Sequence, residues 1–209
     1  MNKVLLLNFN GTIVDTKDLA INIYNKIADK QGYKTVSKDQ VAEFRSLSIR
    51  ERCKLLDVPI YKMPLVGISI KRQYQKYIPD LGPIPSIKEV LNNLKQKGYK
   101  LAFTTSNKQS ETSQFLINNS LDIFTYEHYS FNPFTKSRDI ASFLKKNNLL
   151  KENVIYIGDE LRDIEAAKKN GLFCIAVSWG YDSKELLQKG NADYVVDQPE
   201  DIIEILSRA

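Results

Sequence analysis

The residues best suited to chemistry come in short polar groups that follow apolar runs. The clearest group is the segment 158–163, Gly-Asp-Glu-Leu-Arg-Asp, which follows the apolar run 154–157. In a strand followed by a helix, this spacing places Asp159 at the strand end and Asp163 in the first helical turn. Carboxylate oxygens are the ligands that hard cations such as Mg²⁺ prefer. The structural alternative is an acidic helix start that the helix dipole favours.

A second polar group follows the apolar run 4–7, which together with Phe9 has the pattern of a strand buried on both faces. Asn8 and Asn10 lie two residues apart, and the dipeptide Asn10-Gly11 is typical of a sharp turn. Open α/β sheets bind ligands at the carboxyl ends of their strands, so we expect the active site here. Polar groups buried there must be paired, because an unpaired one costs roughly 1–3 kcal/mol.

Two further segments carry groups that bind anions. Thr105 and Ser106 follow the apolar run 101–104 and supply hydroxyl and main-chain N–H groups at a helix start, which suits a phosphate. A simple helix N-cap is the alternative for this segment. Lys136 precedes another helical pattern, where it either neutralises a phosphate or is simply exposed. Phosphoryl transfer uses such groups together with a nucleophile and a carboxylate-bound metal.

Taken in order, these segments resemble the four motifs of the haloacid-dehalogenase-like (HAD) phosphohydrolases over nearly the whole chain. Segment 8–12, Asn-Phe-Asn-Gly-Thr, resembles a first motif that reads Asp-x-Asp-Gly-Thr in that family. Segments 156–167 and 176–180 resemble its phosphoglycolate-phosphatase-like branch. The resemblance implies an α/β fold, a Rossmann-like parallel-sheet core with an inserted helical cap. It also implies Mg²⁺-dependent hydrolysis of a small phosphomonoester.

The resemblance assigns a role to each matching position. The phosphate would be held by Thr105, Ser106 and Lys136, the metal by Asp159 and Asp163 with Asn8 and Asn10, and catalysis would involve Asn8, Asn10 and Lys136. Asn8 stands where the family has its nucleophilic aspartate, and Asn10 where it has its general acid/base. An amide is a poor nucleophile, cannot form an aspartyl-phosphate and cannot shuttle a proton. Loss of two negative charges should weaken Mg²⁺ binding and ease the binding of a phosphate dianion.

We therefore expect a phosphatase scaffold that is inactive or severely impaired. The alternative is a catalytically dead protein that binds a phosphate ester or regulates a partner. Three origins of the two asparagines stay open: laboratory replacement, natural loss of activity, and unusual chemistry. Arg45 and Arg50, with Arg52, are candidates for contact with an anionic substrate, unless they serve only solubility. His128 is expected at the surface of a strand end.

The elements that must position these residues follow from hydrophobic periodicity. We predict a core domain at 1–12 and 83–209, in which strands alternate with helices, and a helical cap at 13–82. A Ser-x-x-Gln or Ser-x-x-Glu pattern predicts capping boxes at Ser37 and Ser86. In the last predicted cap helix, 64–77, we expect Leu65, Ile68 and Tyr74 to face inward. Strands are predicted at 100–105, 126–131, 154–157, 173–178 and 194–196, after the first strand.

Composition narrows the class of protein. The 209 residues are 43% hydrophobic, enough for a core domain with a modest insertion. The net charge is +5, but the lysines are scattered in helical patterns, so we expect no nucleic-acid partner and instead a small anionic metabolite. There are two distant cysteines and no apolar run of membrane-spanning length, which favours a cytoplasmic protein without membrane contact. We expect a monomer or homodimer.

Overall fold

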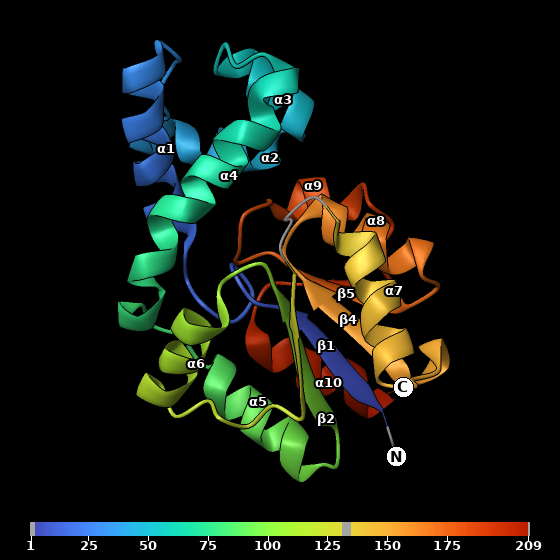
Figure 1. The fold of residues 1–209 in the computed structure, drawn as a ribbon. Helices are drawn as coiled ribbons and strands as arrows, with labels where there is room; N and C mark the ends of the chain where they lie inside the picture. Colours follow the sequence, from blue (N-terminus) through green and yellow to red (C-terminus); the bar gives the residue numbers. More distant parts are fainter. Residues whose placement is uncertain (1–2, 131–134, 209) are drawn as a thin grey trace.

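The structure, a computed structural model, describes residues 3–130 and 135–208. In these residues six parallel strands form one sheet in the order β3-β2-β1-β4-β5-β6 (Figure 1). The strands are β1 (Val4–Asn8), β2 (Lys100–Thr105), β3 (Tyr126–Tyr129), β4 (Val154–Gly158), β5 (Phe173–Val177) and β6 (Tyr194–Val196). The predicted α/β fold with a parallel sheet is thus confirmed. The predicted strand 126–131 ends at Tyr129, and Phe131 lies outside the described residues.

Strand β1 lies at the centre of the sheet, between β2 and β4, and all five of its residues are buried. Its side chains alternate between two hydrophobic clusters, as a strand covered on both faces requires. Leu5 and Leu7 pack with side chains of α5 (Ile87–Gln96), α6 (Gln109–Asn118) and α10 (Pro199–Arg208). Val4 and Leu6 pack with α7 (Lys136–Lys146), α8 (Leu161–Lys169) and α9 (Lys184–Gln188). This double cover holds the carboxyl end of β1 rigidly in the middle of the sheet.

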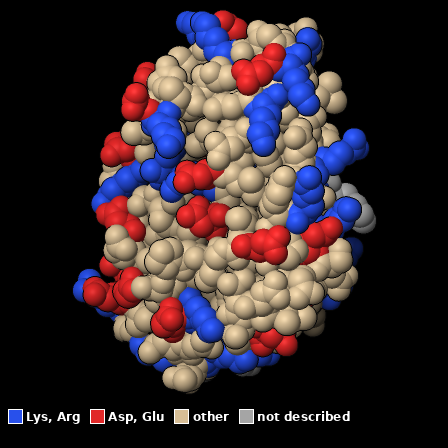
Figure 2. Space-filling view, turned by 90° about the vertical axis from the view of Figure 1, so that its left-hand side faces the viewer, with Lys and Arg blue, Asp and Glu red and all other residues tan. Residues whose placement is uncertain are grey.

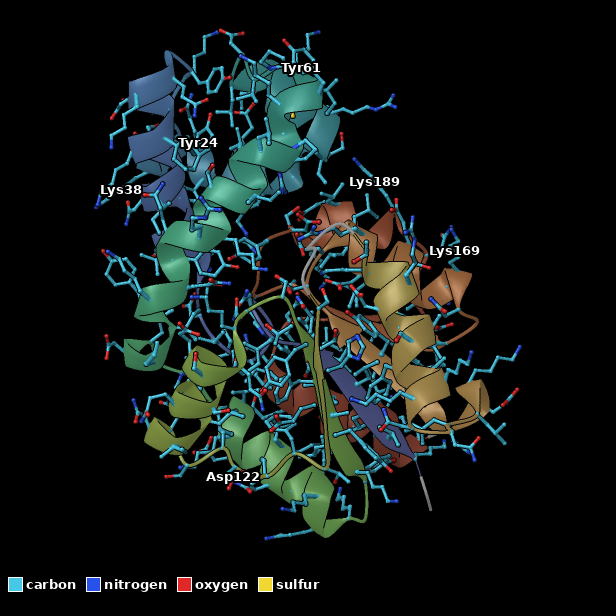
Figure 3. The ribbon with its side chains drawn as sticks, viewed as in Figure 1. Tyr24, Lys38, Tyr61, Asp122, Lys169 and Lys189 are labelled. Carbon is cyan, nitrogen blue, oxygen red and sulfur yellow. The ribbon has the colours of Figure 1, made fainter. Side chains whose placement is uncertain are left out.

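A helical segment, residues 17–80, stands over the carboxyl ends of the strands (Figure 1). It contains α1 (Lys17–Gln31), η1 (Lys38–Gln40), α2 (Val41–Ser46), α3 (Ile49–Leu55), η2 (Ile60–Lys62), α4 (Met63–Tyr74) and η3 (Gln75–Asp80). It has a hydrophobic cluster of its own, in which Tyr24 is buried, whereas Tyr61 points away from it into solvent (Figure 3). The domain boundaries at 12/13 and 82/83 stay a prediction.

Two of the helix-end signals predicted from the sequence are present in the structure. Gly32 ends α1 in the left-handed conformation, with φ of 71°, and the capping box between Ser37 and Gln40 is formed. The prediction of a capping box at Ser86 is wrong. Ser86 adopts the left-handed conformation, with φ of 61°, and its side chain makes no cap hydrogen bond. A capping residue typically has β-region backbone angles, which the left-handed Ser86 does not have.

The inward face of α4 also differs from the prediction. Tyr74 is buried, but Leu65 and Ile68 are 66% and 42% exposed. Instead, Val66 and Ile70 pack against the cluster of the helical segment. Helix α4 carries apolar side chains around most of its circumference, so periodicity alone does not select the buried face.

The surface carries charges of both signs. On the face drawn in Figure 2, lysine and arginine side chains lie among aspartate and glutamate side chains. Among the residues that the structure describes, no helix is both long and apolar enough to cross a bilayer. The expected absence of a nucleic-acid partner stays a prediction.

Candidate functional site

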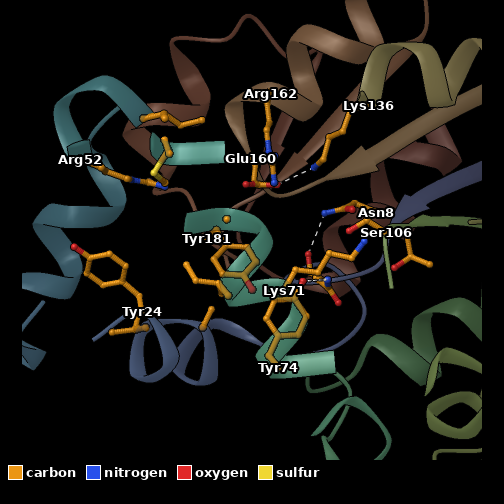
Figure 4. A pocket seen from close by; sticks show the side chains of 18 of the residues that line it. Asn8, Tyr24, Arg52, Lys71, Tyr74, Ser106, Lys136, Glu160, Arg162 and Tyr181 are labelled. Carbon is orange, nitrogen blue, oxygen red and sulfur yellow. Dashed lines mark hydrogen bonds and ion pairs between the residues drawn. The ribbon is translucent and has the colours of Figure 1, made fainter. Parts of the chain in front are cut away.

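A cavity of about 250 Å³ lies between the carboxyl ends of the central strands and the helical segment. Asn8, Ser106 and Lys136 lie at one side of it, and Tyr24 and Arg52 at the other (Figure 4). The polar segments predicted from sequence therefore meet around one space. They meet because the carboxyl ends of parallel strands share one edge of the sheet.

Asn8 ends β1 and is 8% exposed. Its amide nitrogen donates two hydrogen bonds, to the main-chain oxygen of Asn10 at 3.0 Å and to Asp159 Oδ1 at 2.9 Å. Both acceptors are oxygens, one of them a carboxylate. The amide N–H groups thus occupy the space between two oxygen atoms that converge at the ends of β1 and β4.

Asn10 is locked by a second set of contacts. Its amide exchanges two hydrogen bonds with the side-chain amide of Asn107, and its Nδ2 also donates to the Tyr74 hydroxyl at 2.7 Å. Burial raises the pKa of the Tyr74 phenol above its ordinary range, so this hydroxyl stays protonated. Tyr74 is the last residue of α4, so Asn10 ties the helical segment to the sheet.

The last residue of β2 and the residue that follows it supply the next part of the cavity wall. Thr105 and Ser106 both line it, and the Thr105 hydroxyl accepts from the main-chain N–H of Asn107 at 3.1 Å. Helix α6 takes Lys108 as its N-cap residue, with no side-chain cap bond. The simple N-cap alternative for Thr105 and Ser106 is therefore wrong, and both residues face the cavity instead.

Lys136 lies in a buried cluster of charges. Its ammonium contacts Asp163 Oδ1 at 2.6 Å and Glu160 Oε2 at 2.8 Å, and Arg162 contacts the same Glu160 oxygen at 2.8 Å. Burial would raise the pKa of Glu160, but Arg162 and Lys136 outweigh it and hold that pKa well below its usual range. Asp163 also accepts from the Tyr156 hydroxyl at 2.7 Å. Lys136 is thus held over the cavity by two carboxylates.

Asp159, directly after β4, is fully buried. Besides Asn8, it accepts from the Thr12 hydroxyl at 2.8 Å and from the Tyr181 main-chain N–H at 2.8 Å. Burial, then Glu160 and Asp163, raise its pKa to about 7, although Lys136 acts in the opposite direction. Gly11 and Gly180 pack so closely on it that a β-carbon at either position would overlap its carboxylate. Gly11 also has φ of +79°, which other residues rarely adopt.

Comparison with known proteins agrees with this arrangement. The family model described as "Haloacid dehalogenase-like hydrolase" matches residues 5–177. The chain belongs to the haloacid dehalogenase-like hydrolases. The phosphoglycolate phosphatase of Synechococcus elongatus is 24% identical, over 99% of this chain and 98% of that protein. The pyrophosphatase PpaX of Bacillus mycoides is 23% identical, over 98% and 96%. A haloacid dehalogenase-like hydrolase from Streptococcus pneumoniae shares the fold, with a TM-score of 0.77 at 20% identity and 98% coverage of both chains.

The oxygen donors in this HAD site do not fit a divalent cation as the side chains stand. Hard cations need several oxygen ligands, preferably carboxylates. The Asn10 carbonyl and Asp159 already accept from the Asn8 amide, and Asp163 is engaged by Lys136 and Tyr156. In the described part of the chain, no group of three or more acidic, histidine or cysteine side chains could hold a metal.

The arginines of the helical segment differ in position. Arg52 lines the cavity, whereas neither Arg45 nor Arg50 is part of its lining. Arg45 donates to the main-chain oxygens of Ser178 and Asp182, at 2.6 and 3.3 Å, and so ties α2 to the core. Arg50 is exposed on α3.

Several residues of the site have no signal strong enough to find them in the sequence. Glu160 and Arg162 lie inside segment 158–163, which resembles a HAD motif, but the resemblance assigns no role to either residue. Asn107 follows the phosphate-binding segment, and only the fold shows that it pairs with Asn10. Tyr74 comes from the far end of the helical segment, 64 residues after Asn10. Tyr181 lies in the loop after β5 and lines the cavity.

Proposed function

We propose that this chain binds a small phosphomonoester on a phosphatase scaffold and does not hydrolyse it at a significant rate. One observation carries the proposal: the Asn8 amide N–H groups lie between the Asn10 carbonyl and Asp159 Oδ1. In the family, this position supplies the nucleophilic carboxylate beside Mg²⁺. Here a neutral amide replaces the nucleophile, and its N–H groups satisfy the oxygens that a cation would use.

The groups that would hold phosphate remain in place. Ser106, Thr105 and Lys136 line the cavity, with the ammonium fixed by two carboxylates. Asn8 and Asn10 carry no charge, so the first motif exerts no repulsion on a dianion. Hydrogen bonds to a charged group contribute about 1.5–3 kcal/mol each, which supports binding without a metal.

The position of Asn10 supports the absence of turnover. A general acid must hold a proton that it can transfer, which an amide does not. Each hydrogen-bonding group of the Asn10 side chain is also engaged by Asn107 or Tyr74. We further propose that the protein binds a cytoplasmic metabolite, as a monomer or homodimer and without nucleic acid. We expect Mg²⁺-dependent hydrolysis only from a variant that carries both Asn8→Asp and Asn10→Asp.

The test compares the unaltered protein with Asn8→Asp and Asn8→Asp/Asn10→Asp. Phosphate release from a panel of small phosphomonoesters is measured with and without Mg²⁺, and inorganic phosphate binding is measured by calorimetry. We expect binding but no turnover by the unaltered protein, and Mg²⁺-dependent turnover by the double variant. Asn93→Asp, at an exposed position on α5, is the matched control and should change neither result. Turnover by the unaltered protein at the rate of the double variant would contradict the proposal, as would absence of phosphate binding.

A further inference from the structure

The two ends of the cavity differ in chemistry. The core contributes almost only polar groups, among them Asn8, Ser106 and Lys136. The helical segment contributes mostly apolar side chains, from α1 through α4: Ile21, Val36, Phe44, Leu56, Met63 and Ile70. One wall would therefore hold a phosphate, and the opposite wall would exclude water from whatever the phosphate is attached to.

Helix α4 presents a continuous face to the cavity. Met63, Gly67, Ile70 and Tyr74 recur at the three- and four-residue spacing of one helix face, and all line the cavity. Leu65 and Ile68 lie off this face and are exposed. Gly67 has no side chain, so at the middle of this face only the helix backbone bounds the space.

The arginine at the apolar end is already paired. Arg52 lies there, but it contacts Asp182 at 2.6 Å and donates to the main-chain oxygens of Phe44 and Arg45, at 2.9 and 3.1 Å. Its guanidinium also lies over the Phe44 ring, 4.9 Å from the centroid. Among the described residues, the helical segment contributes one other cation to the cavity lining, Lys71, which lies one turn before Tyr74 on α4. The Tyr74 hydroxyl accepts from Asn10, so Lys71 is near the polar end of the cavity. A carboxylate on the ligand would therefore meet apolar side chains and an engaged arginine.

We propose that the ligand is the phosphate monoester of a hydrophobic alcohol, with its alkyl or aromatic group between α1, α3 and α4. This inference rests on the proposed function, since it uses the same phosphate end. It separates this chain from a binder of phosphoglycolate, whose carboxylate would be desolvated at the apolar end without a free partner. Burial of each methylene group contributes about 0.8 kcal/mol, so affinity should rise about fourfold per methylene.

Calorimetry on the unaltered protein tests this with methyl, butyl and hexyl phosphate, 2-phosphoglycolate and inorganic phosphate. We expect the dissociation constant to fall about fourfold per methylene, with an increasingly negative heat-capacity change, and phosphoglycolate to bind no more tightly than methyl phosphate. Equal affinity for methyl and hexyl phosphate, or tighter binding of phosphoglycolate than of hexyl phosphate, would overturn the inference. If none of the probes binds, inorganic phosphate included, the proposed function itself fails.

A pair of variants locates the apolar group. Gly67→Phe places a ring in the cavity and should reduce hexyl phosphate binding to the affinity of methyl phosphate. Ile68→Phe adds the same ring one residue later, at an exposed position outside the lining, and should keep the chain-length dependence. Loss of that dependence in Ile68→Phe but not in Gly67→Phe would overturn the placement. The chain-length series needs no variant, so it decides the inference even if Gly67→Phe does not fold.

Discussion

The side-chain amides of Asn10 and Asn107 face each other and exchange two hydrogen bonds, of 2.9 and 3.2 Å. Asn107 is 3% exposed and Asn10 is half-buried, so water reaches the Asn107 amide only after a change in structure. The pair joins the turn after β1 to the segment after β2. Through Tyr74 it also reaches the last residue of α4. This contact couples the position of the helical segment to the candidate phosphate site.

The first prediction follows from that pairing. Asn107→Ala should lower the free energy of unfolding by about 1–3 kcal/mol, because it removes both hydrogen bonds of the amide pair and leaves a donor and an acceptor of the half-buried Asn10 without that partner. Urea unfolding measures the change. Asn93→Ala, at an exposed position on α5, is the control and should stay within about 0.5 kcal/mol of the unaltered protein. Equal effects of the two substitutions would show that the amide pair does not stabilise the fold.

A second prediction concerns the buried charges. Lys136→Met should destabilise the fold by about 3–5 kcal/mol, because Asp163 and Glu160 lose the cation that both contact. Lys34→Met removes a lysine from an ion pair of similar length, 2.9 Å, in which both side chains are at least 60% exposed. That substitution should cost less than about 1 kcal/mol. Denaturant titrations of both variants measure the contrast, and similar losses would contradict the structural role given to Lys136.

The third prediction concerns pH. Burial against α7 lowers the pKa of His128 below 6.5; Asp139 opposes this shift and Lys146 adds to it. The unfolded chain therefore binds a proton more readily than the folded protein, so stability contributed by neutral His128 is present above pH 6.5 and is lost as pH falls. His128→Gln should make unfolding less sensitive to acid below that pH and leave the pH dependence between 7.5 and 8.5, both rough bounds above that pKa, unchanged. Thermal unfolding over this range checks it, and parallel pH profiles would refute it.

Sequence patterns predict the elements well where burial alone decides them. An unbroken apolar run placed β1 at the centre of the sheet, and regular helix signals such as Gly32 gave correct ends. Sequence patterns fail where contacts between distant segments decide which side chains are buried or which backbone conformation a residue adopts. Apolar residues surround most of α4, so only packing shows that Gly67 faces the cavity and Leu65 faces solvent. At Ser86, the chain path imposes a left-handed residue on a capping-box pattern.

The residues of the candidate site also form two groups, those that the sequence identifies and those that only the fold brings to the site. Strand ends identify Asn8, Thr105 and Asp159, because a parallel sheet brings such ends together. The contacts between these residues and segments far along the chain are not coded locally. Tyr74 and Tyr181 reach the site from the helical segment and from the loop after β5, and no spacing in the sequence relates them to Asn10 or Asp159.

The last prediction uses the two Asn-Gly dipeptides, Asn10-Gly11 and Asn170-Gly171. In flexible peptides the glycine nitrogen attacks the asparagine side chain, forms a succinimide and leaves an acid, because glycine permits the required backbone rotation. In the folded protein, the Gly11 N–H donates to the Val14 oxygen at 2.9 Å, and the Asn10 amide is held by Asn107. Deamidation at Asn10 should therefore be much slower than in a peptide of residues 6–14.

Asn107→Ala separates the two restraints. It releases the Asn10 side chain from Asn107 but leaves its bond to the Tyr74 hydroxyl, and it should accelerate deamidation there. Asn170 should keep its own rate, because its amide is bound by the Ser137 and Ala166 oxygens and is far from the substitution in sequence. Peptide mapping by mass spectrometry of aged samples follows both positions in one experiment. If both asparagines accelerate together, general loosening of the fold explains the result. If neither does, the Gly11 hydrogen bond and the contact with Tyr74 are enough to protect Asn10. An acid at position 10 should still give no phosphatase activity, since Asn8 would remain a neutral amide where a nucleophile is needed.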